Sequence, residues 1–151
     1  MDKQDYNFVI TTKVNAEVAF DAICRVPEWW TSNFEGNSHK LKDVFTVHFG
    51  DVFVTIKITD FIPGKKIVWS VTDCDLQWLK DKKEWKDSQI KWVISTEGNE
   101  THISMTHLGL VPEIECYDDC KQGWNFHLGE SLFKLITEGV GNPNISTRKT
   151  S

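Results

Sequence analysis

The chain has 151 residues, of which 40% are hydrophobic, and its formal net charge at pH 7 is −5. This length fits one domain with a substantial core. No apolar run approaches the roughly 20 residues of a membrane span, and the polar, acidic N-terminus lacks the pattern of a secretory signal. Because phosphate binding requires a basic surface, the acidic balance disfavours a nucleic-acid partner. We therefore expect a cytoplasmic protein that neither inserts into a membrane nor binds nucleic acid.

The four cysteines are Cys24, Cys74, Cys116 and Cys120. In a cytoplasmic chain they are expected to be reduced thiols. Cys116 and Cys120 would share one face of a helix, and thiols at this spacing can bind a soft metal. A structural zinc site needs four ligands, however, and no second pair of Cys or His residues stands at ligand spacing. We therefore expect no metal and no cofactor.

The N-terminal part of the chain combines a strand pattern with two helix patterns. Apolar residues alternate with the others from Tyr6 to Thr12, which predicts a first strand. Asn15 is a suitable N-cap for a helix with apolar residues at helical spacing. Pro27 fits the first turn of a second short helix, Pro27 to Thr31, which is expected to end near Gly36.

The middle of the chain reads as a series of strands joined by turns. Alternating apolar residues predict strands at Val44 to Phe49, Val52 to Phe61, Ile67 to Val71, Ile90 to Ile94 and Ile103 to His107. Short turns between most of them favour antiparallel pairing, with one face of the sheet buried. A long polar connection from Thr72 to Ser88 interrupts the series and carries Trp78 and Trp85.

The last third of the chain predicts one long helix, from Asp118 to Glu138, with Gly139 as its C-cap. The stripe expected to face the sheet is Trp124, Leu128, Ser131, Leu132 and Leu135. An apolar helix that follows nearly all the strands needs a curved sheet around it, and this arrangement leaves a cavity. We expect residues 1–139 to form a single domain and residues 140–151 a short flexible tail.

Local stretches in this order resemble the START-like, or SRPBCC, superfamily, whose fold is called the helix grip. Val14 to Trp30 is similar to its opening signature with a tryptophan pair, and Asp60 to Trp69 is similar to its central hairpin. Thr101 to Leu110, followed by Gly123-Trp124 and Ser131-Leu132, resembles its closing signature. Within the superfamily, the chain resembles the branch named for the activator of the 90-kDa heat-shock-protein ATPase.

This resemblance implies an α+β helix-grip fold, also described as birch-pollen-allergen-like. In it a curved antiparallel sheet of about six or more strands wraps around a long C-terminal helix, with two short helices after the first strand. Two features depart from the superfamily's pattern. The connection from Thr72 to Ser88 is long and charged, and the segment around Cys116 and Cys120 has no role in it. The resemblance implies a fold and a cavity, and it does not imply a reaction.

Strand parity predicts which residues line that cavity, because residues two apart in a strand share a face. The candidate ligand-binding residues, drawn from the inward strand phases, the helix stripe and the short-helix connector, are Trp30, Phe34, Trp69, Trp92, Met105, His107, Trp124, Leu128 and Ser131. Each of them has an alternative role as ordinary core packing. His107 is expected either to be satisfied by a hydrogen bond, to a strand-end carbonyl or to Ser131, or to anchor a ligand.

Three hypotheses about function remain open. The first is non-catalytic binding of a small hydrophobic ligand, lipid-like or aromatic, in the cavity. The second follows from the resemblance: a co-chaperone-like protein that regulates a heat-shock ATPase through surface contacts, in which an exposed Trp78 and Trp85 would form the interface. The third is a cyclase- or hydrolase-like enzyme with His107 as acid or base. Because no nucleophile, acid pair or metal set has diagnostic spacing, we assign no catalytic residue and favour a protein that is not an enzyme.

Overall fold

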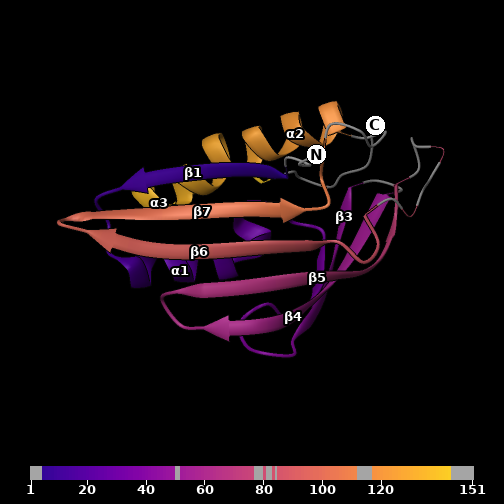
Figure 1. The fold of residues 1–151 in the computed structure, drawn as a ribbon, viewed down its shortest axis with the longest axis horizontal. Helices are drawn as coiled ribbons and strands as arrows, with labels where there is room; N and C mark the ends of the chain where they lie inside the picture. Colours follow the sequence, from indigo (N-terminus) through magenta and orange to yellow (C-terminus); the bar gives the residue numbers. More distant parts are fainter. Residues whose placement is uncertain are drawn as a thin grey trace.

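The computed structural model describes residues 5–49, 52–76, 80, 83, 85–111 and 117–143. A first strand, a helical connector, further strands and a long C-terminal helix follow one another along the chain (Figure 1). The elements are β1 (Tyr6–Thr12), α1 (Ala16–Cys24), the short 3₁₀-helix η1 (Val26–Glu28), β2 (Phe34–Gly36), β3 (Val44–Phe49), β4 (Val52–Ile62), β5 (Lys66–Asp75), β6 (Gln89–Glu97), β7 (Glu100–Leu108), α2 (Tyr117–Phe126), η2 (His127–Leu132) and α3 (Phe133–Glu138).

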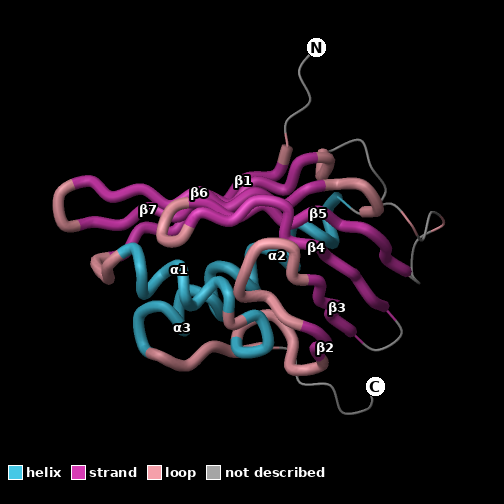
Figure 2. The backbone as a smooth tube through the Cα atoms, turned by 90° about the horizontal axis from the view of Figure 1, so that it is seen from below, coloured by secondary structure: helices cyan, strands magenta, loops and turns pink. Residues whose placement is uncertain are grey.

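The strands form one antiparallel sheet in the order β1-β7-β6-β5-β4-β3-β2. Strands β2 to β7 are neighbours in chain order, and β1 pairs with β7 along its whole length. Two register shifts in β4, between Thr55 and Ile56 and between Ile58 and Asp60, bend the sheet. The helices lie on one side of the sheet, and β2 to β4 curl toward them (Figure 2). The predicted helix-grip fold is confirmed.

The C-terminal helix is continuous from Tyr117 to Glu138, and its middle segment, η2, is π-helical. Gly129 lies in this segment, where an added Cβ would stand 3.4 Å from the Phe8 ring, so the helix packs closely on β1. Gly139 ends the helix with φ at 85°, a conformation that favours glycine. The predicted helix and its C-cap are therefore confirmed, apart from a start one residue earlier.

The first helix begins as predicted. The Asn15 side-chain oxygen accepts a hydrogen bond from the Val18 N–H at 2.9 Å and so satisfies a backbone donor that the helix itself leaves unpaired. The connector after it differs from the prediction. The 3₁₀-helix η1 ends at Glu28, and Phe34–Gly36 forms the edge strand β2 against β3, where we had expected only the end of a helix. Pairing of its backbone with β3 makes this segment a strand. Three residues are too few to show the alternation that predicts a strand from sequence.

Tryptophan rings occupy much of the core between sheet and helix. Trp69, Trp92 and His107 are at most 1% exposed, which confirms the predicted inward phases of β5, β6 and β7. The rings of Trp69 and Trp92 pack edge to face, with their centroids 5.2 Å apart. The ring of Trp29 packs against both of them. Side chains therefore fill the central part of the space between sheet and helix.

Two further expectations need correction. Strand β5 continues to Asp75, so the first part of the expected connection from Thr72 to Ser88 belongs to the sheet, because its backbone pairs with β4. Cys120 is bonded in a disulfide, whereas Cys24 and Cys74 are buried thiols. The expectation of reduced thiols rested on the inferred compartment and used no geometry. Trp78, Cys116 and most of the predicted tail lie outside the described residues.

Candidate functional site

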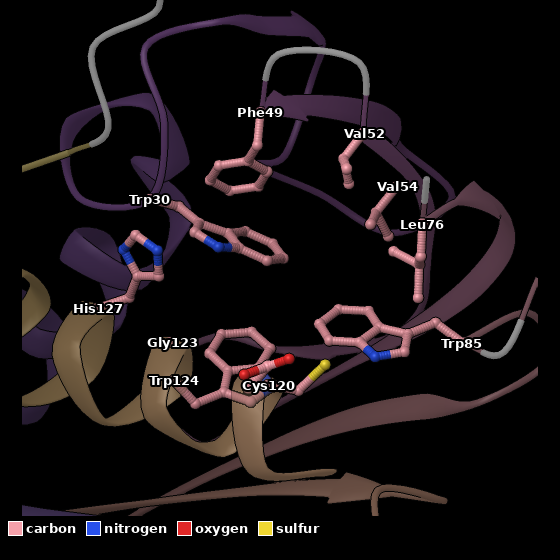
Figure 3. Close-up of a pocket in the computed structure, with 11 residues that line it drawn as sticks. Trp30, Phe49, Val52, Val54, Leu76, Trp85, Cys120, Gly123, Trp124 and His127 are labelled. Carbon is pink, nitrogen blue, oxygen red and sulfur yellow. The ribbon is translucent and has the colours of Figure 1, made fainter. Parts of the chain in front are cut away.

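A cavity of about 190 Å³ lies between the curled part of the sheet and helix α2 (Figure 3). Its lining comes from the end of β3, the start of β4, the residue after β5, the connector after α1, the connection before β6, and the helical segments α2 and η2. The described lining residues are Trp30, Phe49, Val52, Val54, Leu76, Trp85, Asp119, Cys120, Gly123, Trp124 and His127.

Aromatic rings form most of the wall; we refer to Trp30, Phe49, Trp85 and Trp124 as the aromatic wall. Trp124 is its centre, since its ring lies 5.0 Å from Trp30 and 5.9 Å from Trp85, centroid to centroid. The Trp85 and Trp124 rings are almost parallel, 9° apart. Phe49 extends the wall from Trp30 at 5.9 Å. Ring faces and edges are thus presented to the cavity over a large apolar surface.

Two polar side chains complete the described lining. Asp119 is exposed in the first turn of α2 and makes no ion pair with any residue in the described ranges. His127 lies beside Trp30 and Phe49 at the start of η2 (Figure 3). Burial lowers its pKa from 6.5 to about 4, although the Trp29 carbonyl acts in the opposite direction, so the imidazole is neutral at pH 7. Its buried Nδ1 has no hydrogen-bond partner among the described residues.

His107 lies directly behind the aromatic wall and holds two of its members. The Trp124 indole N–H can only donate, and it donates to His107 Nδ1 at 3.1 Å. The proton of the neutral imidazole is therefore on Nε2, which donates to Ser88 Oγ at 3.0 Å. Ser88 in turn donates to the Trp85 carbonyl at 2.6 Å. This chain of three hydrogen bonds, which we call the His107 network, ties Trp85 to Trp124.

The His107 network decides between the two expectations for this residue. Both ring nitrogens are paired inside the protein, and desolvation alone lowers the His107 pKa from 6.5 to about 3. The side chain does not line the cavity. It is satisfied by hydrogen bonds, as one alternative held, but by Ser88 and Trp124. Ser131, the expected partner, donates instead to the Trp29 carbonyl at 2.5 Å.

Of the nine candidate ligand-binding residues, Trp30 and Trp124 line the cavity. Phe34 is half-buried and stacks on Phe45 at the sheet edge. The others are buried in the core outside the lining: Trp69, Trp92, Met105, His107, Leu128 and Ser131. The cavity lies toward the β3–β4 end of the sheet, and the candidates were drawn mainly from β5 to β7.

Most of the cavity lining was not among the candidate residues drawn from the sequence. Val52 and Val54 lie two residues apart in the predicted strand from Val52 to Phe61 and so share a face, which means that parity alone could have found them. Trp85 carried no such signal because it lies in a connection, yet it is 8% exposed and folds back on Trp124. It is therefore not an exposed interface residue. His127 lies on the helix outside the stripe predicted to face the sheet, so helical periodicity did not select it.

Several kinds of chemistry have no candidate group in the described part of the chain. No group of three or more His, Cys, Asp or Glu side chains in it could hold a metal ion. His107 has no nitrogen left for proton transfer to a bound molecule. None of the described helices is long and apolar enough to cross a membrane. What the geometry offers is an aromatic cavity with one carboxylate and one neutral imidazole.

Solved structures of other proteins match this fold. The solution structure of the Aha1 dimer from Colwellia psychrerythraea matches with a TM-score of 0.74 at 20% identity, over 91% of this chain and 99% of that one. Protein MLL2253 from Mesorhizobium loti matches with a TM-score of 0.66 at 14% identity, over 89% and 98% of the two chains. CalU16 from Micromonospora echinospora matches with a TM-score of 0.64 at 14% identity, over 89% and 77%.

A scan against protein-family models and a search of curated proteins found no match. Identities of 20% or less to the solved structures show a shared fold and no more. The sequence motifs and these structures point to the same architecture, a curved antiparallel sheet wrapped around a C-terminal helix. The chain has the helix-grip fold that its sequence motifs predicted.

Proposed function

We propose that this protein binds a small, largely apolar ligand in the cavity between the sheet and the C-terminal helix. The observation that carries the proposal is the aromatic wall. Three tryptophans and a phenylalanine converge on one space of about 190 Å³, together with the aliphatic side chains of Val52, Val54 and Leu76. Apolar cavities with a few polar groups are the usual form of small-molecule sites.

The size of the cavity limits the ligand. An engineered apolar cavity of roughly 150 Å³ holds one benzene molecule, and sites for drug-sized ligands begin at roughly 300 Å³. A cavity of about 190 Å³ therefore fits a compound with one ring and a short substituent. A long acyl chain would need more space, so the aromatic alternative is favoured over the lipid-like one.

Gly123 offers a sharp test because it lines the cavity from α2 and an added Cβ would meet no heavy atom within 4 Å. We expect Gly123→Leu to fill the cavity and abolish binding of phenethyl alcohol, measured by tryptophan fluorescence and calorimetry. Gly123→Ala is the matched control. It gives the same helix a better helix former but leaves most of the volume, so it should keep binding. Equal binding by both variants would contradict the proposal.

The other two hypotheses stay predictions with less support. Regulation of a heat-shock ATPase is supported by the likeness of fold to the Aha1 structure, but Trp85 is buried in the aromatic wall and cannot serve as an exposed contact. The hypothesis of an enzyme that uses the same cavity no longer has a candidate acid or base, since both nitrogens of His107 are paired within the protein. A cytoplasmic location also stays a prediction.

A further inference from the structure

We propose that the ligand is a small aromatic amine that binds as a cation, with its ammonium group at Asp119 and its ring against the tryptophans of the aromatic wall. This inference rests on the proposed binding function and names the chemical class of the ligand. It follows from three properties of the cavity: its charge, the nature of its walls and its size.

The charge of the described lining is negative. Asp119 is its one formally charged side chain, and no Lys or Arg among the described residues lines the cavity. The imidazole of His127 adds no positive charge at neutral pH, because burial keeps its pKa near 4. A carboxylate or phosphate ligand would face Asp119 without a described counter-charge. A cation would pair with it.

The walls favour the same sign of charge. An indole ring carries negative potential on its faces, and cations bind there more strongly than on other aromatic rings. The indoles of Trp30, Trp85 and Trp124 lie together in the cavity (Figure 3), and Asp119 lines the same cavity. Recognition of organic cations by such groups of rings is well established in proteins. The carboxylate and the indoles therefore select for the same property of the ligand.

The size of the cavity selects against large cations. About 190 Å³ holds one aromatic ring with an amine on a short alkyl chain, by comparison with the roughly 150 Å³ that hold benzene. Phenethylamine has these features and is protonated at pH 7. Phenethyl alcohol has the same skeleton and no charge, and phenylacetate carries the opposite charge. These three compounds separate the charge of the ligand from its ring.

The experiment measures the dissociation constants of the three compounds for the full chain, by tryptophan fluorescence and calorimetry at low salt. We expect phenethylamine to bind about tenfold more tightly than phenethyl alcohol, and phenylacetate to bind most weakly. Raising the ionic strength should weaken the binding of the amine and leave the binding of the alcohol unchanged, because only the amine depends on a partly exposed charge pair.

Asp119→Asn tests the carboxylate, and Asp118→Asn is the matched control. Both residues are exposed in the first turn of α2, so both substitutions change the net charge and the interaction with the helix dipole alike. Only Asp119 lines the cavity. The Asp119 variant should bind amine and alcohol about equally, and the Asp118 variant should keep the preference. Circular dichroism and thermal unfolding would verify that both variants fold.

The outcomes distinguish the two proposals. If the wild-type protein binds the alcohol at least as tightly as the amine, the cationic ligand is excluded while the binding function stands. If both Asp→Asn variants lose the preference equally, the position of the ammonium group at Asp119 is excluded while the binding function stands. If none of the three compounds binds and the Gly123→Leu variant behaves like the wild-type protein, the binding function fails as well.

Discussion

The buried His107 should make the stability of this protein sensitive to mild acid. Its folded-state pKa lies near 3, well below the value of 6.5 for an exposed histidine, because desolvation disfavours the charged ring. Below pH 6.5 the unfolded chain binds a proton that the folded protein does not bind. The contribution of His107 to the free energy of unfolding is therefore complete above pH 6.5 and is lost as the pH falls toward 3.

The magnitude follows from the size of the shift. Each pH unit below 6.5 costs about 1.36 kcal/mol of the free energy of unfolding, until the folded-state pKa is reached. At pH 5 the loss from His107 is therefore about 2 kcal/mol, and at pH 3 about 4 kcal/mol. No charged side chain takes part in the His107 network to offset it, since its partners are Ser88, Trp124 and the Trp85 carbonyl.

The assay is urea unfolding between pH 7.5 and pH 5 for the wild-type protein and His107→Gln. Glutamine does not titrate, and it keeps a donor and an acceptor, so the variant should be less stable by about 1–3 kcal/mol at pH 7. Between pH 7 and pH 5 it should lose about 2 kcal/mol less than the wild-type protein, so the two stability curves converge.

A matched control is His102→Gln, on the same strand but on its other face, where the side chain is partly exposed. Because this variant leaves His107, Ser88 and Trp124 in place, it should keep the acid sensitivity that His107→Gln loses. His127 contributes to acid sensitivity in the same direction, and both variants retain it, so it cancels in the comparison. An unchanged slope in His107→Gln would refute the assignment of the acid-sensitive proton to His107.

Three further predictions concern stability, each measured by urea unfolding. Ser131→Ala should cost about 1–3 kcal/mol, because its hydroxyl bonds a buried carbonyl and a backbone N–H; a loss under 0.5 kcal/mol would contradict this. Asn15→Ala should cost about 1 kcal/mol by removing a helix cap, and Asn15→Asp should cost much less. Gly36→Ala should lower the free energy of unfolding more than Gly98→Ala does. Both glycines have a positive φ, but only at Gly36 would an added Cβ lie 2.3 Å from the Val44 carbonyl oxygen. Equal losses of stability in the two variants would exclude that clash.

The fold could be predicted because its signals are local and periodic. The alternation in β5, β6 and β7 fixed which residues face inward, and the long apolar helix required a curved sheet. Capping residues such as Asn15 and Gly139 marked helix ends for stereochemical reasons that need no tertiary contact. The edge strand β2 escaped prediction because three residues carry no period.

The site was harder to predict because parity says which way a side chain points, and not whether another side chain already fills the space. Trp69 and Trp92 point inward as expected, but Trp29 packs against both of them and closes the centre. Trp85 reaches the cavity from a connection, where no periodicity applies. Which end of the sheet stays open depends on these long-range packings, which one sequence does not reveal.

The His107 network explains how a residue from a connection can form a stable wall of the cavity. Trp85 belongs to no strand or helix. Its ring stacks against Trp124, and its carbonyl accepts a hydrogen bond from the Ser88 hydroxyl. Both contacts lead to His107, which also packs edge-on against the Trp85 ring at 4.5 Å. A polar group that does not line the cavity thus holds two of the residues that do. A variant at His107 should therefore alter ligand affinity as well as stability, and a ligand held by the aromatic wall should in turn protect the protein against acid.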